Sequence, residues 1–279
     1  MTFSGWLTIF LFVVLLSVLA TALGGYMAKV YSGERVFLSP LLGGPERFLY
    51  KVLRLDPGRG QDWKSYAKSL LIFSLAGWLL LYAILRTQNA FFVPHALNPL
   101  GYHSAPWNVT FNTVSSFVTN TNWQFYSGET TMSYLSQMIG LTVQNWLSAG
   151  VGIVVAVALI RGIVSRSGKS LGNFWQDLVR TIVYVLAPIS VIGALVLVSQ
   201  GVIQNLSTYL TAHTLTGLTQ SIAMGPAASQ LAIKMLGTNG GGFFNVNSAH
   251  PFENPTGLTN FLEAIAILLI PAALCYTFG

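Results

Sequence analysis

The sequence contains little charge, one cysteine and few histidines. Only 8% of its 279 residues are Asp, Glu, Lys or Arg and 53% are hydrophobic, whereas soluble proteins average about 25% charged residues. This composition excludes an ordinary soluble domain and indicates an integral membrane protein. The single cysteine, Cys275, excludes an internal disulfide and a multi-cysteine metal site. The four histidines are scattered along the chain, which indicates polar loop positions and no metal site.

The acidic residues also fail to form a catalytic set. A membrane enzyme would require converging titratable groups, and the eight acidic residues do not supply one, so we predict no catalytic residues in this chain. Five lie in basic loops, where we expect solvated charge balance: Glu34, Glu46, Asp56, Asp62 and Asp177. Glu129 and Glu253 flank two polar turns, where they either raise the local cation concentration or form loop hydrogen bonds.

No charged side chain precedes Lys29, although a cleaved signal peptide needs a positive n-region. We therefore expect residues 6–26 to form an uncleaved first span with the N-terminus outside. Four further apolar runs are candidate membrane spans: residues 69–85, 134–160, 179–200 and 258–278. Pro188 predicts a kink in the fourth span.

The basic residues are confined to two segments. Residues 27–68 hold eight of the fourteen, and a second segment holds Arg161, Arg166, Lys169 and Arg180, which leaves only Arg86 and Lys234. By the positive-inside rule we expect residues 27–68 and 161–178 to be cytoplasmic, with 87–133 and 201–257 outside. The formal charge of +6 is then a topology signal, and we predict no nucleic-acid partner.

The stretch 236–245 reads Leu-Gly-Thr-Asn-Gly-Gly-Gly-Phe-Phe-Asn and is the central feature of the chain. Glycines this dense allow several carbonyls in a row to turn the same way. Such a turn lies at membrane depth only where it lines a cavity or is buried in protein. Inward carbonyls that replace a hydration shell are typical of a potassium filter, and a plain surface loop is the alternative. A phosphate cradle is excluded because Phe243-Phe244 occupies the place of its lysine.

The order of elements repeats. After the leading span, the sequence predicts a span, a short helix, a polar turn and a second span, twice over, with short helices at 111–118 and 226–235. Aligning Thr119-Asn120 with Thr238-Asn239 gives an offset of 119 residues, although the register could slip by one. We divide the chain into a leading helix and basic loop (1–68), a first pore unit (69–161) and a second (162–279).

Polar residues inside the predicted spans are candidates for function. Gln137, Gln144 and Asn145 lie along the third span, where we expect amide hydrogen bonds between helices. Lys234, on the second short helix, and Glu263, in the fifth span, are intramembrane charges and thus possible functional groups. We expect each to be a structural partner for pore units beyond these two.

Several motifs resemble the potassium-binding A subunit of the bacterial potassium-transporting ATPase, the KdpA family. They are residues 117–124 (Phe-Val-Thr-Asn-Thr-Asn-Trp-Gln), 126–131, 136–145, 224–245 and 250–256. The resemblance covers nearly the whole chain and is weakest in the first span and outer loops. It implies an all-α polytopic membrane protein of the potassium channel/transporter superfamily, with two of the four units, each M1–pore helix–filter–M2, of one pore.

The resemblance also implies site residues for a K+ selectivity filter on the extracellular side. These are Thr119, Asn120, Thr121 and Asn122 in the first unit and Thr238, Asn239, Gly240 and Gly241 in the second, with Gln124, Gly237 and Gly242 close by. In the family's register Asn120 faces Gly240. K+ is the transported ion and the only metal that the resemblance implies.

Partners follow from the resemblance as well. The ion would pass to the B subunit, a P-type ATPase that uses ATP, and small C and F subunits would complete a complex in the bacterial inner membrane. Family members have four pore units and this sequence has two, so we expect a truncated form. Transport by this chain alone does not follow from the family resemblance. The alternative is a two-unit potassium channel that dimerises to complete the fourfold pore. The size and symmetry of the purified species would discriminate between them.

Single-cysteine labelling tests the predicted topology. In a Cys275→Ser background, we expect an impermeant thiol reagent to reach Leu100→Cys only from outside, because the basic loops hold the opposite side in the cytoplasm. Gly58→Cys is the matched control and should be labelled only in inverted vesicles. Labelling of position 100 from the cytoplasmic side alone would overturn the assignment.

Overall fold

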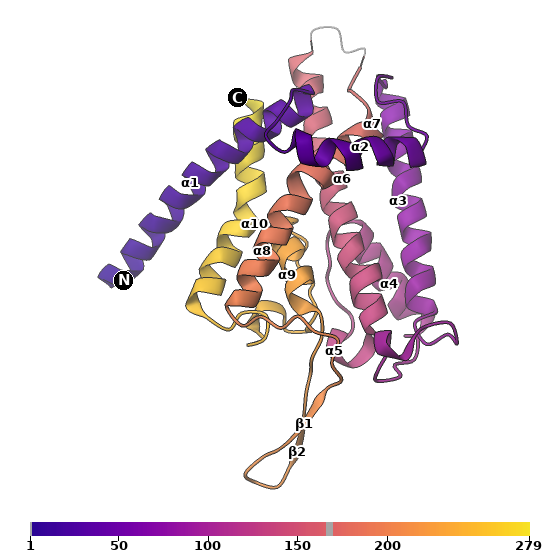
Figure 1. Ribbon diagram of the computed structural model, residues 1–279, viewed down its shortest axis with the longest axis vertical. Helices are drawn as coiled ribbons and strands as arrows, with labels where there is room; N and C mark the ends of the chain where they lie inside the picture. The colour runs from indigo at the N-terminus through magenta and orange to yellow at the C-terminus, as the bar shows by residue number, and fades with distance from the viewer. Residues whose placement is uncertain (1, 166–169) are drawn as a thin grey trace.

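In the described part of the chain, five long apolar helices form the body of the protein. The computed structural model describes residues 2–165 and 170–279. The helices long and apolar enough to cross a membrane are α1 (Phe3–Ser32), Ser136–Val164, Phe174–Ser199, α3 (Trp63–Arg86) and α10 (Gly257–Phe278). Figure 1 shows α3, α6, α8 and α10 spanning the bundle, while α1 leans away from it toward the N-terminus. The predicted polytopic helical architecture is confirmed.

Short helices follow the repeated order that the sequence predicts. The first unit runs from α3 through η1 (His95–Leu97), α4 (Trp107–Val118), α5 (Gly128–Thr131) and the π-helical η2 (Ser136–Thr142) into α6 (Val143–Val164). The second runs from α7 (Phe174–Arg180) through the π-helical η3 (Thr181–Leu186), α8 (Ala187–Ser199), α9 (Ala227–Leu236) and η4 (Asn247–Ala249) to α10. The boundaries of the two units stay a prediction.

Pro188 alters the fourth span, as its sequence position suggests. Proline has no N–H to donate to the carbonyl four residues earlier, and its ring crowds that carbonyl. The carbonyl in question belongs to Tyr184, and it accepts a hydrogen bond of 2.9 Å from the Tyr26 hydroxyl of α1. A π-helical stretch, residues 181–186, ends two residues before the proline. The irregular turn is therefore tied to the first helix.

Ion pairs join the helices at the cytoplasmic end that we predict. Arg161 binds both carboxylate oxygens of Asp177, at 2.6 and 3.0 Å, and also donates to the carbonyl of Tyr31 at 3.1 Å. Asp177 is only 2% exposed, and Glu46 pairs with Arg180 at 3.0 Å. Our expectation of solvated charge balance is therefore wrong for Asp177 and Glu46. Two of the basic residues counted above, Arg166 and Lys169, lie outside the described residues.

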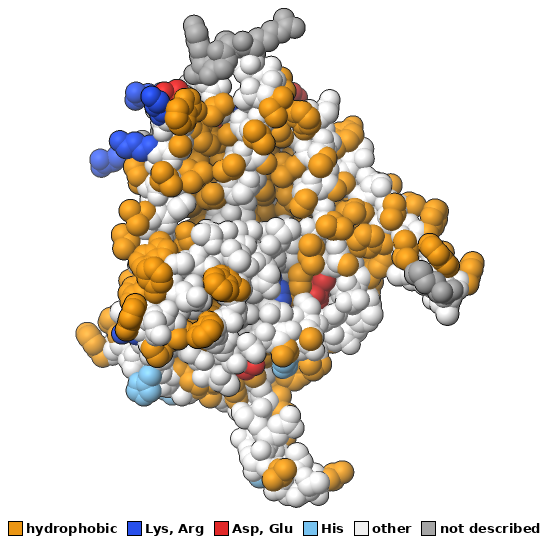
Figure 2. Space-filling view, turned by 180° about the vertical axis from the view of Figure 1, so that it is seen from behind, with side chains coloured by type: hydrophobic (Ala, Val, Ile, Leu, Met, Phe, Trp, Pro, Cys, Tyr) orange, Lys and Arg blue, Asp and Glu red, His pale blue; other side chains and the backbone are white. Residues whose placement is uncertain are grey.

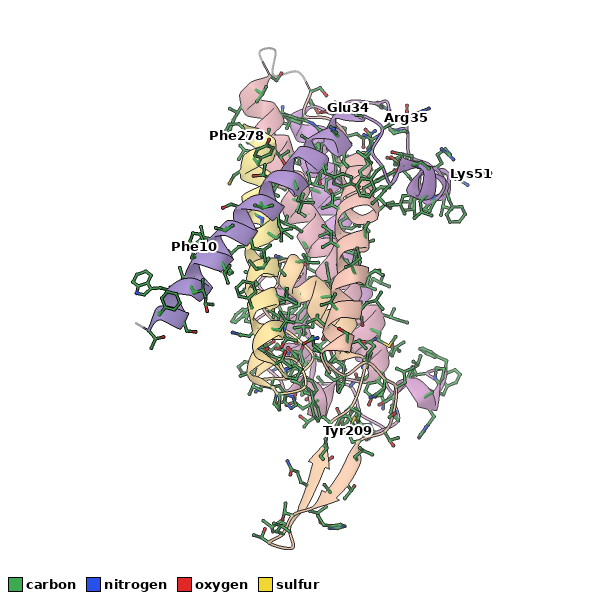
Figure 3. All side chains as sticks on the ribbon, turned by 60° about the vertical axis from the view of Figure 1, so that its left-hand side comes forward. Phe10, Glu34, Arg35, Lys51, Tyr209 and Phe278 are labelled. Atoms are coloured by element: carbon green, nitrogen blue, oxygen red, sulfur yellow. The ribbon has the colours of Figure 1, made fainter. Side chains whose placement is uncertain are left out.

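Two segments predicted as loops contain regular structure. Residues 27–68 include α2 (Ser39–Val52), which lies across the end of the bundle (Figure 1). Residues 201–225 include an antiparallel hairpin of β1 (Leu210–His213) and β2 (Thr219–Ile222), with Leu210 opposite Ile222. In Figure 3, Arg35 and Lys51 lie at the same end as Phe278, whereas Tyr209 lies beside the hairpin at the other end.

Helix α1 packs against α10 through a glycine. A Cβ on Gly24 would lie 2.6 Å from the Ala273 carbonyl and 2.8 Å from the Tyr276 Cβ. The Thr277 hydroxyl donates to the Gly24 carbonyl at 3.1 Å, which fixes the crossing. Neighbouring Gly25 has room, because its Cβ would come no closer than 3.7 Å to Tyr276.

The two glycines make a matched pair of variants. We expect Gly24→Ala to destabilise the protein by about 1–3 kcal/mol, since the added methyl overpacks a backbone contact between helices. Gly25→Ala should be tolerated. The measurement is thermal unfolding of each purified variant in detergent, and equal stability of the two would contradict the described α1–α10 packing.

Candidate selectivity filter

The turns after α4 and α9 share one hydrogen-bond pattern. Thr119 N bonds to Ser115 O, and Gly237 N bonds to Ile233 O. One step further, Thr121 N bonds to Ser116 O, and Asn239 N bonds to Lys234 O. Each pair of equivalent residues is 118 positions apart, as are the helix ends at 118 and 236. The identity alignment, with an offset of 119, is therefore wrong by one residue.

Backbone angles repeat with the same spacing. Asn120 and Asn122 have positive φ values of 62° and 53°, and Thr238 and Gly240 have values of 52° and 101°. In each turn the residue between these two has a negative φ, so the two turns share one alternation of backbone handedness. Positive φ is a strained conformation for β-branched Thr238, and strain of this kind clusters at functional sites. The two turns are therefore specialised backbone segments, which the alternative of a plain surface loop does not explain.

The two turns lie against each other. The Asn120 amide donates to the Gly237 carbonyl at 3.1 Å. The Gln124 amide donates to the Gly242 carbonyl at 3.0 Å and accepts from the Gly242 N–H at 3.3 Å. A Cβ on Gly241 would lie 2.0 Å from the Asn122 carbonyl, so only glycine permits this approach. The structure thus brings together the residues that the resemblance assigns to the filter.

Contacts across the two turns join Gly240 and Gly241 to residues of the first turn. Gly240 is next to Thr121, whose carbonyl would lie 3.3 Å from an added Cβ, and Gly241 is next to Asn122. Asn120 instead contacts Gly237 through its amide. Direct opposition of Asn120 and Gly240 stays a prediction.

A buried network of polar side chains holds the turns from behind. The Asn239 amide donates to Asn120 Oδ1, to Ser148 Oγ at 3.1 Å and to the Asn145 carbonyl at 3.3 Å. Asn145 also accepts from the Asn122 amide at 2.5 Å. We expected Asn145 to bond between helices, and it bonds to Asn122 and Asn239 of the two turns instead. Ser148 was not predicted, and its spacing of three residues from Asn145 was the available signal.

Gln137 braces the second turn near Phe243. Its amide donates to the Phe243 carbonyl at 3.1 Å, and it accepts from the Gln230 amide of α9 at 3.1 Å. The span of residues 136–164 therefore contacts the second turn and α9 through Gln137, and both turns through Asn145. Amide side chains both donate and accept, so they satisfy non-helical backbone without adding net charge.

Part of each turn faces outward. Thr119, Thr121, Thr238 and Gly240 are exposed, whereas Asn122, Asn239 and Gly241 are buried. Figure 2 shows one face of the molecule with a central area of uncharged polar side chains and backbone, bordered by hydrophobic side chains. Within the described chain, nothing covers these four residues.

Lys234 and Glu253 form a buried ion pair directly behind the second turn. Their N–O distance is 2.5 Å and each side chain is 1% exposed. The other Glu253 oxygen accepts from the Phe244 N–H at 3.1 Å, and a Cβ on Gly242 would lie 2.6 Å from Lys234 Nζ. Our expectation that Lys234 pairs with further pore units is therefore wrong.

The remaining acidic candidates have different environments. Glu129 accepts from the Asn245 N–H at 2.9 Å, so Glu129 and Glu253 both form the loop hydrogen bonds that we weighed against cation attraction. Glu263 is 4% exposed, and its Oε1 has no hydrogen-bond partner among the described residues. A role for Glu263 stays a prediction.

The fold and this site define a class of protein. It is a polytopic helical membrane protein in which two short helices end in polar turns braced by buried amides. The family model of the potassium-transporting ATPase A subunit, KdpA, matches residues 10–279, and the chain belongs to this family.

Curated relatives agree with this assignment. The potassium-transporting ATPase potassium-binding subunit of Rhodospirillum centenum is 58% identical over 100% of this chain and 48% of the relative. The subunits of the same name from Pseudomonas syringae pv. tomato and Methylorubrum extorquens are 56% and 53% identical over 98% and 100% of this chain. The chain spans about half the length of the curated relatives it matches.

The buried ion pair generates a prediction about stability. Lys234→Met leaves the Glu253 carboxylate buried without its cation, which we expect to cost about 3–5 kcal/mol of folding stability. The double variant Lys234→Met/Glu253→Gln should recover most of this loss, since the amide oxygen still accepts from Phe244. Thermal unfolding in detergent measures both, with exposed Lys68→Met as control. A single variant as stable as the double would contradict the charge pairing.

Proposed function

We propose that this chain supplies two of the four pore units that bind and select K+ at the outer side of an ATP-driven uptake complex. One observation carries the proposal. Two turns with the same hydrogen bonds and the same alternation of φ, 118 residues apart, lie side by side and contact each other. A single functional loop would not require a second copy of this geometry in contact with the first.

The chemistry of the turns suits a dehydrated monovalent cation. Backbone carbonyls replace the hydration shell of K+ in filters of this type, and the number and field strength of these dipoles set selectivity. The C-terminal ends of α4 and α9 lead into the two turns, and helix C-termini carry partial negative charge that favours a cation. The filter residues in this proposal are Thr119, Asn120, Thr121, Asn122, Thr238, Asn239, Gly240 and Gly241.

Partners and membrane placement are part of the same proposal. The relatives are named as potassium-binding subunits of a potassium-transporting ATPase, which supports transfer of the ion to the P-type ATPase of the complex, its ATP-using B subunit. Small C and F subunits complete the complex in the bacterial inner membrane. This chain contributes no catalytic residue, and its N-terminus and filter turns face the outside.

A dimeric two-unit channel is the second candidate. The exposure of Thr119, Thr121, Thr238 and Gly240 supports any arrangement that covers them with further filter segments. A second copy of the chain could do so, as could further units on a longer chain. The chain covers 48% of the relatives, and this share supports the longer chain.

Glycine at position 240 provides the test. In the full-length protein within its ATPase complex, we expect Gly240→Asp to reduce K+ over Na+ discrimination about tenfold, equivalent to about 1.4 kcal/mol. The carboxylate would enter the carbonyl array beside Thr121 and change its field. The measurement is K+- and Na+-stimulated ATPase activity across ion concentration.

Gly217→Asp is the matched control. Gly217 also has positive φ, 81°, but lies in the turn of the hairpin with no atom within 4 Å of an added Cβ. The Gly217→Asp variant therefore adds the same charge at a position of positive φ that lies outside the proposed filter. Unchanged ion preference in Gly240→Asp, or an equal change in both variants, would refute the proposed function.

A further inference from the structure

Helix α2 presents three chemically different faces. At about 100° per residue, Leu42, Glu46 and Leu49 share the face that packs against α7 and η3. A second face consists of Leu41, Phe48 and Val52, which are 72%, 64% and 59% exposed. The third face is basic and exposed, with Arg47, Lys51 and, just beyond the helix, Arg54. A water-exposed helix has no reason to keep the second face apolar.

The position of α2 matches this division. It lies across the end of the bundle, beside the end of α1 and the start of α7 (Figure 1). Because one face is held by the bundle, the apolar and basic faces lie on either side of that contact. A helix in the plane of a membrane interface has this arrangement, with its apolar face toward the acyl chains and its basic face at the headgroups.

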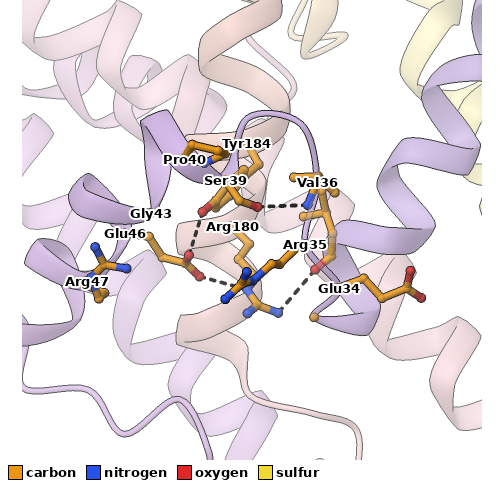
Figure 4. Close-up of a pocket in the computed structure, with 12 residues that line it drawn as sticks. Glu34, Arg35, Val36, Ser39, Pro40, Gly43, Glu46, Arg47, Arg180 and Tyr184 are labelled. Carbon is orange, nitrogen blue, oxygen red and sulfur yellow. Dashed lines mark hydrogen bonds and ion pairs between the residues drawn. The ribbon is translucent and has the colours of Figure 1, made fainter.

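A cavity of about 620 Å³ lies between the end of α1, α2 and η3. Arg35, Arg47 and Arg180 line it, together with Glu34 and Glu46 (Figure 4). Figure 4 shows the Glu34 side chain directed away from Glu46 and Arg180. Arg35 and Arg47 have no ion-pair partner among residues 2–165 and 170–279.

The second carboxylate in the cavity is already engaged. Glu46 accepts from Arg180 Nε at 3.0 Å and from the hydroxyls of Tyr50 and Tyr184 at 2.7 and 2.8 Å. Burial raises the pKa of Glu46, but these three hydrogen bonds outweigh it, so the pKa is lower than usual. The Glu46 carboxylate is therefore occupied by Arg180, Tyr50 and Tyr184. The guanidinium groups of Arg35 and Arg47 stay available for an anion.

We propose that this cavity binds the phosphate headgroup of an anionic phospholipid of the cytoplasmic leaflet, with its acyl chains along the apolar face of α2. Arg35 and Arg47 supply the charge for the phosphate diester. Phe37, 79% exposed, and Phe48 supply apolar surface for the chains. A free phosphate would use the arginines alone and leave the aromatic side chains in water. The inference rests on the cytoplasmic assignment of residues 27–68 and is independent of the filter.

Native mass spectrometry of the full-length protein in its complex tests the proposal. After reconstitution with phosphatidylglycerol and phosphatidylcholine, we expect retention of phosphatidylglycerol by the parent and about 30-fold weaker retention by Arg35→Gln/Arg47→Gln. Lys64→Gln/Lys68→Gln removes the same charge from the exposed start of α3 and should retain the lipid. Equal loss of phosphatidylglycerol from both double variants would overturn the site in favour of general surface charge. If inorganic phosphate displaced the bound lipid and the two lipids were retained equally, the cavity would be a site for free phosphate, and the lipid proposal would be overturned.

A second measurement asks what covers α2. Phe48→Cys in the Cys275→Ser background carries a fluorophore, and we expect lipids brominated along the acyl chain to quench it in the intact complex. Asp56→Cys, in the exposed loop beyond α2, is the control and should stay unquenched. Absence of quenching at position 48 in the complex would show that another protein segment covers this face and would overturn the lipid proposal.

Discussion

Non-helical backbone inside an apolar bundle must find its hydrogen-bond partners within the protein, and the rest of this structure depends on that constraint. The two turns after α4 and α9 leave helical bonding, and Asn122, Asn239 and Gly241 within them are buried. Several of their backbone carbonyls are bonded by amide side chains, since Asn120 donates to Gly237, Gln124 to Gly242 and Gln137 to Phe243. An amide offers a donor and an acceptor together and has no charge that would compete with a cation in the turn. Asn and Gln side chains therefore satisfy the hydrogen bonds of the turn backbone, and the field that acts on a cation comes from the backbone carbonyls.

The exception to this neutrality is Lys234, and Glu253 explains why it is tolerated. A lone buried cation beside the second turn would repel any cation held there and would lose its hydration without compensation. Glu253 neutralises it at 2.5 Å and uses its other oxygen on the Phe244 N–H. The pair therefore links α9 to the chain that leaves the turn, while it adds no net charge.

How far the sequence predicts this structure varies with the kind of signal. The five spans and two short helices follow from long apolar runs and their interruptions, because burying polar backbone in lipid leaves few alternatives. Their ends were less predictable: α3 begins at Trp63, six residues before the predicted span, since the Asp62 side chain caps it at Ser65. Helix α2 was missed because Gly43, Gly44 and Pro45 are typical of a turn. Packing against α7 and η3 overrides that local preference.

Partners across the chain were the least predictable part of the site. Asp177 looked like one more acidic residue in a basic loop, yet burial against Arg161 and Tyr66 makes it a link between helices. Ser148 gave no signal beyond its spacing from Asn145, although it donates to Asn120 at 2.8 Å. Contacts of this kind join residues that are far apart in sequence. A single sequence indicates which polar residues could make such contacts, but it does not show which two residues meet.

The register of the two turns shows why identical residues can mislead. Asn120 and Asn239 are identical in type, but Asn120 has a positive φ and Asn239 does not. The structural counterpart of Asn120 is Thr238, because each is the second residue beyond its pore helix and each has positive φ. Asparagine tolerates this conformation readily and threonine does not. The alternation of backbone handedness is thus maintained with a strained residue in the second turn, which implies that the peptide orientation, and not the side chain, is the feature the two turns share.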